Sequence, residues 1–130
     1  IDAVQLHGDE SPDMCLRFGR RVIKAVTAAD LPHCSRWPES ITLLVDASDA
    51  VRRGGTGQRA DWASVAPFAR RRRLILAGGL DPANVAEAVA TVRPLAIDLS
   101  SGVESAPGIK DATRMRALFE ALRQAEGEWR

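Results

Sequence analysis

The chain has 130 residues, of which 45% are hydrophobic and 27% are charged, as in an ordinary globular domain that can bury a core. Its 18 basic and 17 acidic side chains leave a net charge of +1, so no overall field draws in nucleic acid or anionic lipid. No apolar stretch approaches the roughly 18 residues of a transmembrane helix, and no signal segment opens the chain. We therefore expect a single cytoplasmic domain over residues 1–130, with no nucleic-acid or membrane partner.

The first two predicted strands are short apolar runs. Ala3–Leu6 forms the first, and Ser11-Pro12 marks the helix start after it, because serine caps a helix and proline fits its first turn. Val22–Val26 forms the second and contains Lys24. A lysine inside an apolar strand must reach the mouth of the fold or pair with an acid, and we expect a structural ion pair.

The middle of the chain continues the alternation of strands and helices. In Ala28–Trp37, framing prolines limit the expected helix to one or two turns. The next strands are Thr42–Val45 and Leu74–Ala77, and Asp61 is expected to cap the helix between them. The basic run Arg70–Arg73 ends that helix, where cations complement the helix dipole, so we expect a solvated surface rather than a binding patch.

The last part of the chain holds a fifth predicted strand, Leu95–Leu99, between two helices. Asp81-Pro82 marks the start of the first helix and Asp111 the start of the second, because an aspartate can accept hydrogen bonds from helix N–H groups. Apolar residues recur at helical spacing in both segments. They are Val85, Ala88, Val89 and Val92, and then Met115, Leu118, Phe119 and Leu122. The sequence therefore predicts five β-α units in tandem.

Five strands leave two α/β architectures open. The near-continuous apolarity of the strands favours a parallel sheet covered on both faces. A (β/α)8 barrel needs eight strands and usually about 250 residues, so a barrel requires three units that this chain does not contain. The alternative is an open, doubly wound domain of the flavodoxin kind, which matches the chain in size and also binds ligands at the carboxyl ends of strands.

Two glycine-bearing turns point to a phosphosugar ligand. Ala77-Gly78-Gly79-Leu80 and Asp98-Leu99-Ser100-Ser101-Gly102 each follow a predicted strand, and together they can present backbone N–H groups to one phosphate. The loops after the last two strands of a (β/α)8 barrel frequently form such a site. Either turn alone is also explained by a tight turn that needs positive φ.

Candidate acid–base and substrate groups lie at the same predicted edge. Asp46 ends its strand and is a candidate general acid or base, with a turn or cap as its alternative role. Asp98 can accept hydrogen bonds from sugar hydroxyls, or it is a buried acid satisfied by backbone. His7 ends the first strand, where a structural role is the alternative. The loop Gly54-Gly55-Thr56-Gly57 can cover a ligand or simply connect two elements.

Five groups of motifs run in order from Ile1 nearly to the end of the chain. They are Val4-Gln5-Leu6-His7-Gly8; Gly54-Gly55-Thr56-Gly57 with Asp61-Trp62; Leu76-Ala77-Gly78-Gly79-Leu80 with Asn84-Val85; Val92-Arg93-Pro94; and Asp98-Leu99-Ser100-Ser101-Gly102-Val103-Glu104 with Pro107-Gly108 and Lys110-Asp111. Together they resemble the phosphoribosylanthranilate isomerase family. Several motifs in this order are more specific than one glycine turn and favour a barrel over a doubly wound sheet.

The resemblance implies a partial (β/α)8 TIM barrel that holds strands four to eight of the parallel barrel. It implies an enzyme of tryptophan biosynthesis that converts N-(5-phosphoribosyl)anthranilate to 1-(2-carboxyphenylamino)-1-deoxyribulose 5-phosphate by an Amadori rearrangement, without metal or cofactor. Asp46 then matches the general acid that protonates the furanose ring oxygen, and Asp98 matches a substrate contact. The phosphate-binding positions implied are Gly78, Gly79, Ser101 and Gly102. Further substrate-binding candidates are His7, Gly54, Gly55 and Gly57.

One part of the family's pattern is absent from this chain. The family's general base is a cysteine at the end of its first strand, in a Lys-Ile-Cys-Gly type of motif that does not occur here. Cys15 falls in a predicted helix and Cys34 in an irregular segment, so neither is expected to take that role. The resemblance therefore implies that a missing N-terminal barrel segment supplies the base, and that this chain alone is nearly inactive.

A second class of function stays open from the residues alone. Five β-α units can also form a non-catalytic module that binds a phosphate ligand or assembles through exposed edge strands. That module would have the open doubly wound architecture. The sequence leaves the oligomeric state undetermined.

Overall fold

The computed structural model describes residues 1–47 and 61–127, and its main sheet has five parallel strands. In chain order the strands are β1 (Ala3–Leu6), β2 (Arg21–Thr27), β3 (Thr42–Asp46), β4 (Leu74–Ala77) and β5 (Ala96–Ile97). Each pairs with its neighbour in sequence. Because the strand order never reverses, the sheet lacks the switch point of a doubly wound domain. The doubly wound alternative is therefore wrong for the described part of the chain.

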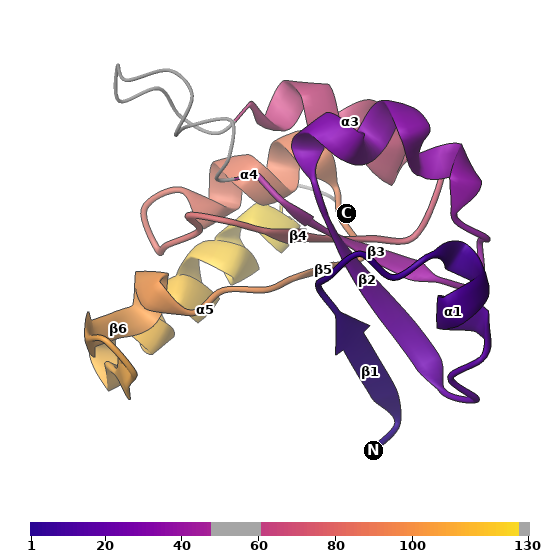
Figure 1. The fold of residues 1–130 in the computed structure, drawn as a ribbon. Helices are drawn as coiled ribbons and strands as arrows, with labels where there is room; N and C mark the ends of the chain where they lie inside the picture. The colour runs from indigo at the N-terminus through magenta and orange to yellow at the C-terminus, as the bar shows by residue number, and fades with distance from the viewer. Residues whose placement is uncertain (48–60, 128–130) are drawn as a thin grey trace.

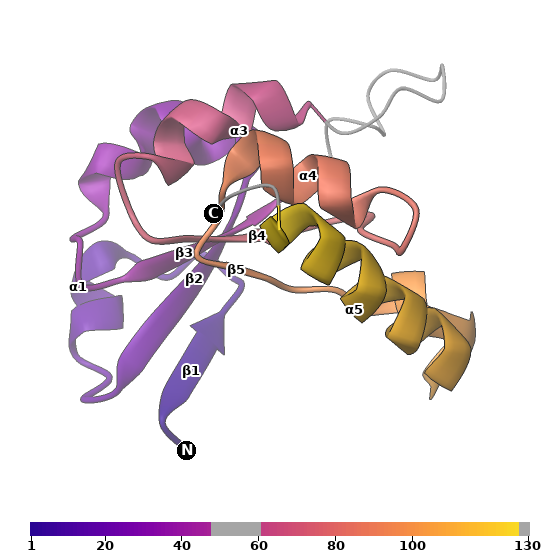
Figure 2. The same cartoon turned by 180° about the vertical axis from the view of Figure 1, so that it is seen from behind.

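The helices lie on one side of the sheet (Figures 1 and 2). They are α1 (Pro12–Leu16), the 3-10 helix η1 (Ala28–Arg36), α3 (Trp62–Ala69), α4 (Val85–Val92) and α5 (Ala112–Gly127). Figure 2 shows them as an arc from α1 over α3 and α4 to α5, and no described helix covers the opposite, inner face. The expected cover on both faces is thus found on one face only. Within residues 1–47 and 61–127, no helix has the length and apolarity needed to cross a membrane.

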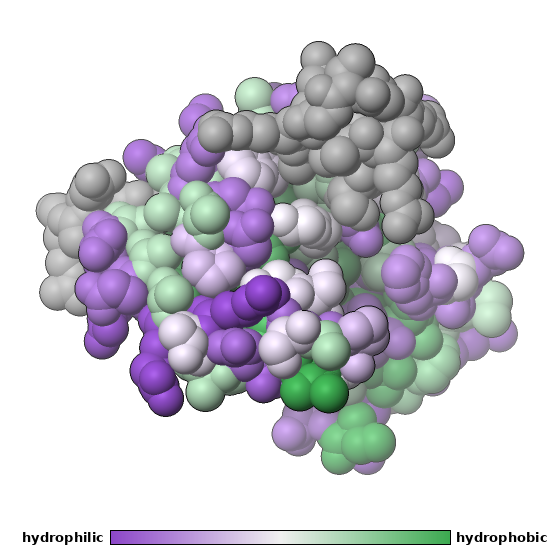
Figure 3. Space-filling view, turned by 90° about the vertical axis from the view of Figure 1, so that its left-hand side faces the viewer, coloured by the Kyte–Doolittle hydropathy of each residue, from purple (hydrophilic) through white to green (hydrophobic). Residues whose placement is uncertain are grey.

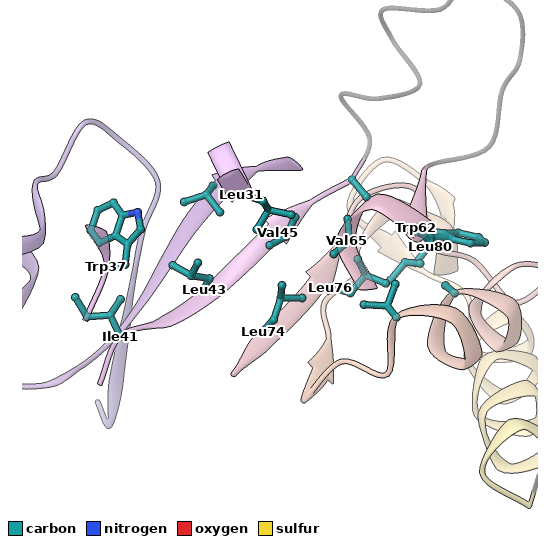
Figure 4. Close-up of a cluster of buried hydrophobic side chains, with 14 of the residues drawn as sticks. Leu31, Trp37, Ile41, Leu43, Val45, Trp62, Val65, Leu74, Leu76 and Leu80 are labelled. Carbon is teal, nitrogen blue, oxygen red and sulfur yellow. The ribbon is translucent and has the colours of Figure 1, made fainter. Parts of the chain in front are cut away.

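The main hydrophobic core fills the space between the outer face of the sheet and these helices (Figure 4). Alternate strand residues point into it, among them Leu43 and Val45 of β3 and Leu76 of β4, which are fully buried. Leu31 of η1 and Val65 of α3 pack against them. Burial of these branched side chains is the main stabilising contribution to the fold.

The inner face of the sheet carries a smaller apolar cluster. Ala25, Leu44 and Ala77 are buried there, whereas Ile23 and Ile75 are only partly buried. These residues alternate along the strands with those of the main core, as the period of two in a strand requires. The inner face is therefore apolar but incompletely covered by the described residues.

Arg72 ties the end of α3 to the segment that follows η1. Its guanidinium donates hydrogen bonds to four backbone carbonyls: those of Cys34 (2.9 Å), Trp37 (3.2 Å), Pro38 (3.3 Å) and Ile41 (2.8 Å). The expectation of a solvated basic face is therefore wrong for Arg72, although Arg70, Arg71 and Arg73 are exposed. A planar fork with several donors suits a cluster of carbonyls.

Most predicted boundaries agree with the structure. The caps at Ser11, Asp61 and Asp111 are confirmed, since each side chain accepts a hydrogen bond from a helix N–H group. The fifth strand is shorter than predicted. Helix α4 begins at Val85, because Asp81 instead accepts hydrogen bonds in a turn that precedes the helix.

Two features near the C-terminal part were not predicted. The 3-10 helix η2 (Ser101–Val103) leads into an antiparallel hairpin of β6 (Glu104–Ala106) and β7 (Ile109–Lys110). In addition, η1 extends over nine residues as a 3-10 helix, longer than the one or two turns expected.

Replacing Arg72 with lysine is expected to lower the free energy of unfolding by about 2–4 kcal/mol, because one ammonium group cannot serve four carbonyls. Urea denaturation followed by tryptophan fluorescence measures this change. The matched control Arg71→Lys removes the same group from an exposed neighbour, and should change stability by less than about 0.5 kcal/mol. Equal urea midpoints for the two variants would contradict the role assigned to Arg72.

Candidate functional site

Two carboxylates lie at the carboxyl ends of neighbouring strands. Asp46 is the last residue of β3 and is paired in register with Ala77 of β4. Asp98 follows β5, and its backbone N–H donates to the carbonyl of Leu76 on β4 at 2.8 Å. Asp46 lies two residues beyond Leu44, so the strand period directs it to the inner face. A single strand, β4, thus lies between the two aspartates.

A cavity of about 410 Å³ opens between these aspartates. Its lining residues are Asp46, Ala77, Gly78, Gly79, Leu80, Asp98, Leu99, Ser100 and Ser101. The volume is in the range of small-molecule sites. Figure 3 faces this end of the sheet, where the side chains near the centre are hydrophilic to neutral in hydropathy. The cavity brings together five of the residues that the sequence singled out, two acidic and three from the glycine-bearing turns.

The two glycine-bearing turns are in direct contact. A Cβ atom on Gly102 would lie 1.9 Å from the carbonyl oxygen of Leu80, so only glycine fits there. Gly78 and Gly79 have φ of +95° and +65°, a region that glycine adopts most readily. The first turn therefore needs glycine because its φ angles are positive. In the second turn, Gly102 is needed because the backbone of the first turn lies too close for a side chain. Gly102 borders a neighbouring hollow on the α5 side rather than the cavity itself.

Asn84 holds the first turn in place. Its side-chain amide donates to the Gly79 carbonyl at 2.8 Å, and its Oδ1 atom accepts from the Asp81 N–H at 2.9 Å. Asp81 in turn accepts from the N–H groups of Ala83 and Asn84. Asn84 is not among the site residues expected from the sequence, although Asp and Asn side chains often hydrogen-bond to nearby backbone groups in turns.

Lys24 and Glu10 hold the backbone next to His7. Lys24 is buried, donates to the Gly8 carbonyl at 2.7 Å and forms an ion pair with Glu10 at 3.1 Å. Glu10 also accepts from the Gly8 N–H at 3.0 Å. The predicted structural ion pair is confirmed. His7 itself is exposed at the end of β1 and does not line the cavity.

The remaining predicted residues divide into two groups. The loop glycines Gly54, Gly55 and Gly57 lie outside the described residues. Cys15 and Cys34 are free thiols on the outer side of the sheet, where Cys15 is buried in the main core and Cys34 packs against it. Burial raises the pKa of the Cys15 thiol. Neither cysteine lines the cavity, so neither is placed to act as a base there.

Sequence comparison identifies close relatives over nearly the whole chain. A family model described as N-(5'phosphoribosyl)anthranilate (PRA) isomerase matches residues 1–121. The N-(5'-phosphoribosyl)anthranilate isomerase of Magnetococcus marinus is 47% identical over 129 residues, which are 97% of this chain and 61% of the relative. That of Geobacter sulfurreducens is 48% identical, with 98% of this chain and 62% of the relative covered. The chain spans about three fifths of the length of these relatives.

Solved structures of phosphoribosylanthranilate isomerases have a similar fold to this chain. Monomers generated from the dimeric phosphoribosylanthranilate isomerase of Thermotoga maritima match with a TM-score of 0.79 and 33% identity, over 95% of this chain and 61% of that chain. A phosphoribosyl anthranilate isomerase in complex with reduced 1-(o-carboxyphenylamino)-1-deoxyribulose 5-phosphate matches with a TM-score of 0.74 and 33% identity, over 95% and 60%.

Gly102→Ala is expected to weaken binding of ribose 5-phosphate at least about tenfold, because the added methyl group must displace one turn from the other. Isothermal titration calorimetry measures the affinity. Gly19→Ala is the control: Gly19 has a φ of +62° in open space outside the cavity, so this variant lowers stability by about 1 kcal/mol without changing the affinity. An unchanged affinity in Gly102→Ala would contradict a role of this contact in binding the phosphate ligand.

Proposed function

Because the chain belongs to the N-(5'-phosphoribosyl)anthranilate isomerase family, we propose that it forms the acid and phosphate side of such an enzyme in tryptophan biosynthesis. The observation that carries this proposal is the single cavity that joins Asp46 and Asp98 to both glycine-bearing turns. An acid and an anion site within one small cavity suit a substrate that carries a sugar ring and a phosphate.

The proposed substrate is N-(5'-phosphoribosyl)anthranilate, and the reaction needs one acid and one base. Asp46 protonates the furanose ring oxygen as its bond to C1 breaks, which opens the ring and leaves an iminium group. A base then removes the proton from C2, and the resulting enol rearranges to the ketone of the product. Asp98 accepts hydrogen bonds from sugar hydroxyls. The phosphate is held by backbone N–H groups of Gly78, Gly79 and Ser101, which line the cavity, and of Gly102, which follows Ser101 in the same turn.

Turnover requires a base, and neither cysteine of the chain lines the cavity. The described part has its two cysteines on the outer side of the sheet. We therefore assign the base to three further β-α units, supplied by a segment outside this chain, which complete an eight-stranded barrel. In that assembly the present strands are numbers four to eight, and His7 and the glycines at 54, 55 and 57 contact the substrate.

Exposed apolar side chains at both edges of the sheet support the proposal of a further segment. On the β1 side, Met14, Leu16 and Phe18 are about half exposed, and on the β5 side so are Leu95 and Phe119. Among the described strands, β1 pairs only with β2 and β5 only with β4. Edge strands flanked by apolar helices are suited to pairing with further strands. About two fifths of the length of each of these relatives lies outside the part that this chain matches, which is enough for three β-α units.

A fusion tests the acid assignment. The part of the Magnetococcus marinus relative that this chain does not match is joined to the start of the chain, and loss of substrate fluorescence is recorded. We expect turnover from the fusion, and a kcat lower by about 10²–10⁴-fold in Asp46→Asn, which removes the proton donor.

The control for that variant is Glu39→Gln, which removes an exposed carboxylate near the opposite end of β3. It should leave kcat within about twofold, as a surface change far from the reacting groups. Full turnover by Asp46→Asn would contradict the role of Asp46 as the acid. Turnover by the 130-residue chain alone would contradict the assignment of the base to a further segment.

A further inference from the structure

The β6–β7 hairpin holds Ser100 from several directions. The Glu104 carboxylate accepts from the Ser100 hydroxyl at 3.1 Å, from Lys110 at 2.7 Å and from the Gly108 N–H at 3.2 Å. Lys110 also donates to the Ser100 carbonyl at 3.0 Å and to its hydroxyl at 3.1 Å. All three donors of the ammonium group are thus directed at Ser100 and Glu104.

The rest of the same turn is fixed by packing. Val103 is buried against Val85 of α4 and Leu118 of α5, and Gly102 lies against the Leu80 carbonyl. These two contacts fix the end of the turn at Gly102 and Val103. The hairpin fixes the near end at Ser100, next to Ser101, which lines the cavity.

Charge balance explains why the hairpin uses an ion pair. A lone carboxylate beside an anion site would repel the anion, whereas the Lys110 ammonium group neutralises Glu104 at 2.7 Å. The same lysine, followed by the Gly108 N–H, lowers the pKa of Glu104, so this carboxyl group stays ionised at neutral pH. The pair can therefore hold the turn without adding net negative charge.

We propose that Glu104 and Lys110 are positioning residues for phosphate binding, which hold Ser100, Ser101 and Gly102 so that the backbone N–H groups of the turn are directed at one anion. This inference rests on the proposed function, since it requires a phosphate site at these turns. Glu104 and Lys110 do not themselves bind the phosphate, and both act through the turn.

Calorimetric titration of the 130-residue chain with ribose 5-phosphate, and with inorganic phosphate, tests the inference. Lys110→Met should weaken binding of both ligands at least about tenfold, because it loosens Ser100 and leaves Glu104 unneutralised. The double variant Glu104→Gln/Lys110→Met should bind more tightly than Lys110→Met alone, since it removes the uncompensated charge. A purely structural role predicts the opposite order, with the double variant at least as weak.

Amide chemical shifts provide a second readout that does not depend on the ligand. In ligand-free Lys110→Met, the ¹H–¹⁵N resonances of Ser101 and Gly102 should shift, while those of β1 to β3 stay in place. Arg123→Met is the matched control, because it removes the cation of an exposed ion pair with Glu120 on α5 and should change neither the affinity nor these resonances.

The outcomes separate the two proposals. Absence of ribose 5-phosphate binding by the unmodified chain would overturn the phosphate site, and the positioning role with it. Binding by the unmodified chain, with equal affinity in Lys110→Met and unmoved Ser101 and Gly102 resonances, would overturn the positioning role alone.

Discussion

The contact between Gly102 and the Leu80 carbonyl is the constraint on which the candidate site depends. It joins the turn after β4 to the turn after β5, and it leaves no room for a side chain. Asn84 fixes the first turn from one side, and the β6–β7 hairpin fixes the second turn from the other. Backbone N–H groups from both turns can then face one anion without the mobility of a charged side chain.

The order of the strands determines which side chains and turns line that cavity. Because β3, β4 and β5 are consecutive neighbours, Asp46 reaches the same cavity as both turns. Burial, in contrast, is uneven across the sheet, with a closed core on the outer face and partly exposed Ile23 and Ile75 on the inner face. An apolar inner face with incomplete cover is what part of a barrel would show. The partly exposed inner face supports our proposal that a further segment covers it and supplies the base.

The sequence predicted strand positions, caps and the two turns because each depends on local chemistry. Apolar runs identified β1 and β4 with their observed bounds, and the caps at Ser11 and Asp111 follow from single side chains. The roles of Arg72 and Lys110 could not be predicted in this way, because their partners are carbonyls and carboxylates brought close only by folding. In the sequence alone, the basic run and the segment 104–110 that forms the hairpin have the composition of ordinary surface. The contact of Gly102 with Leu80 could not be predicted from the sequence for the same reason.

Titration of this chain with a separately produced N-terminal segment of a relative tests whether a further segment completes the site at the cavity. Sedimentation and substrate turnover would be recorded on the same samples at increasing ratios of segment to chain. We expect a one-to-one complex, with turnover that is absent without the segment and reaches a plateau at equal concentrations. Turnover by the chain alone, or a stable pair of chains that excludes the segment and stays inactive, would contradict it.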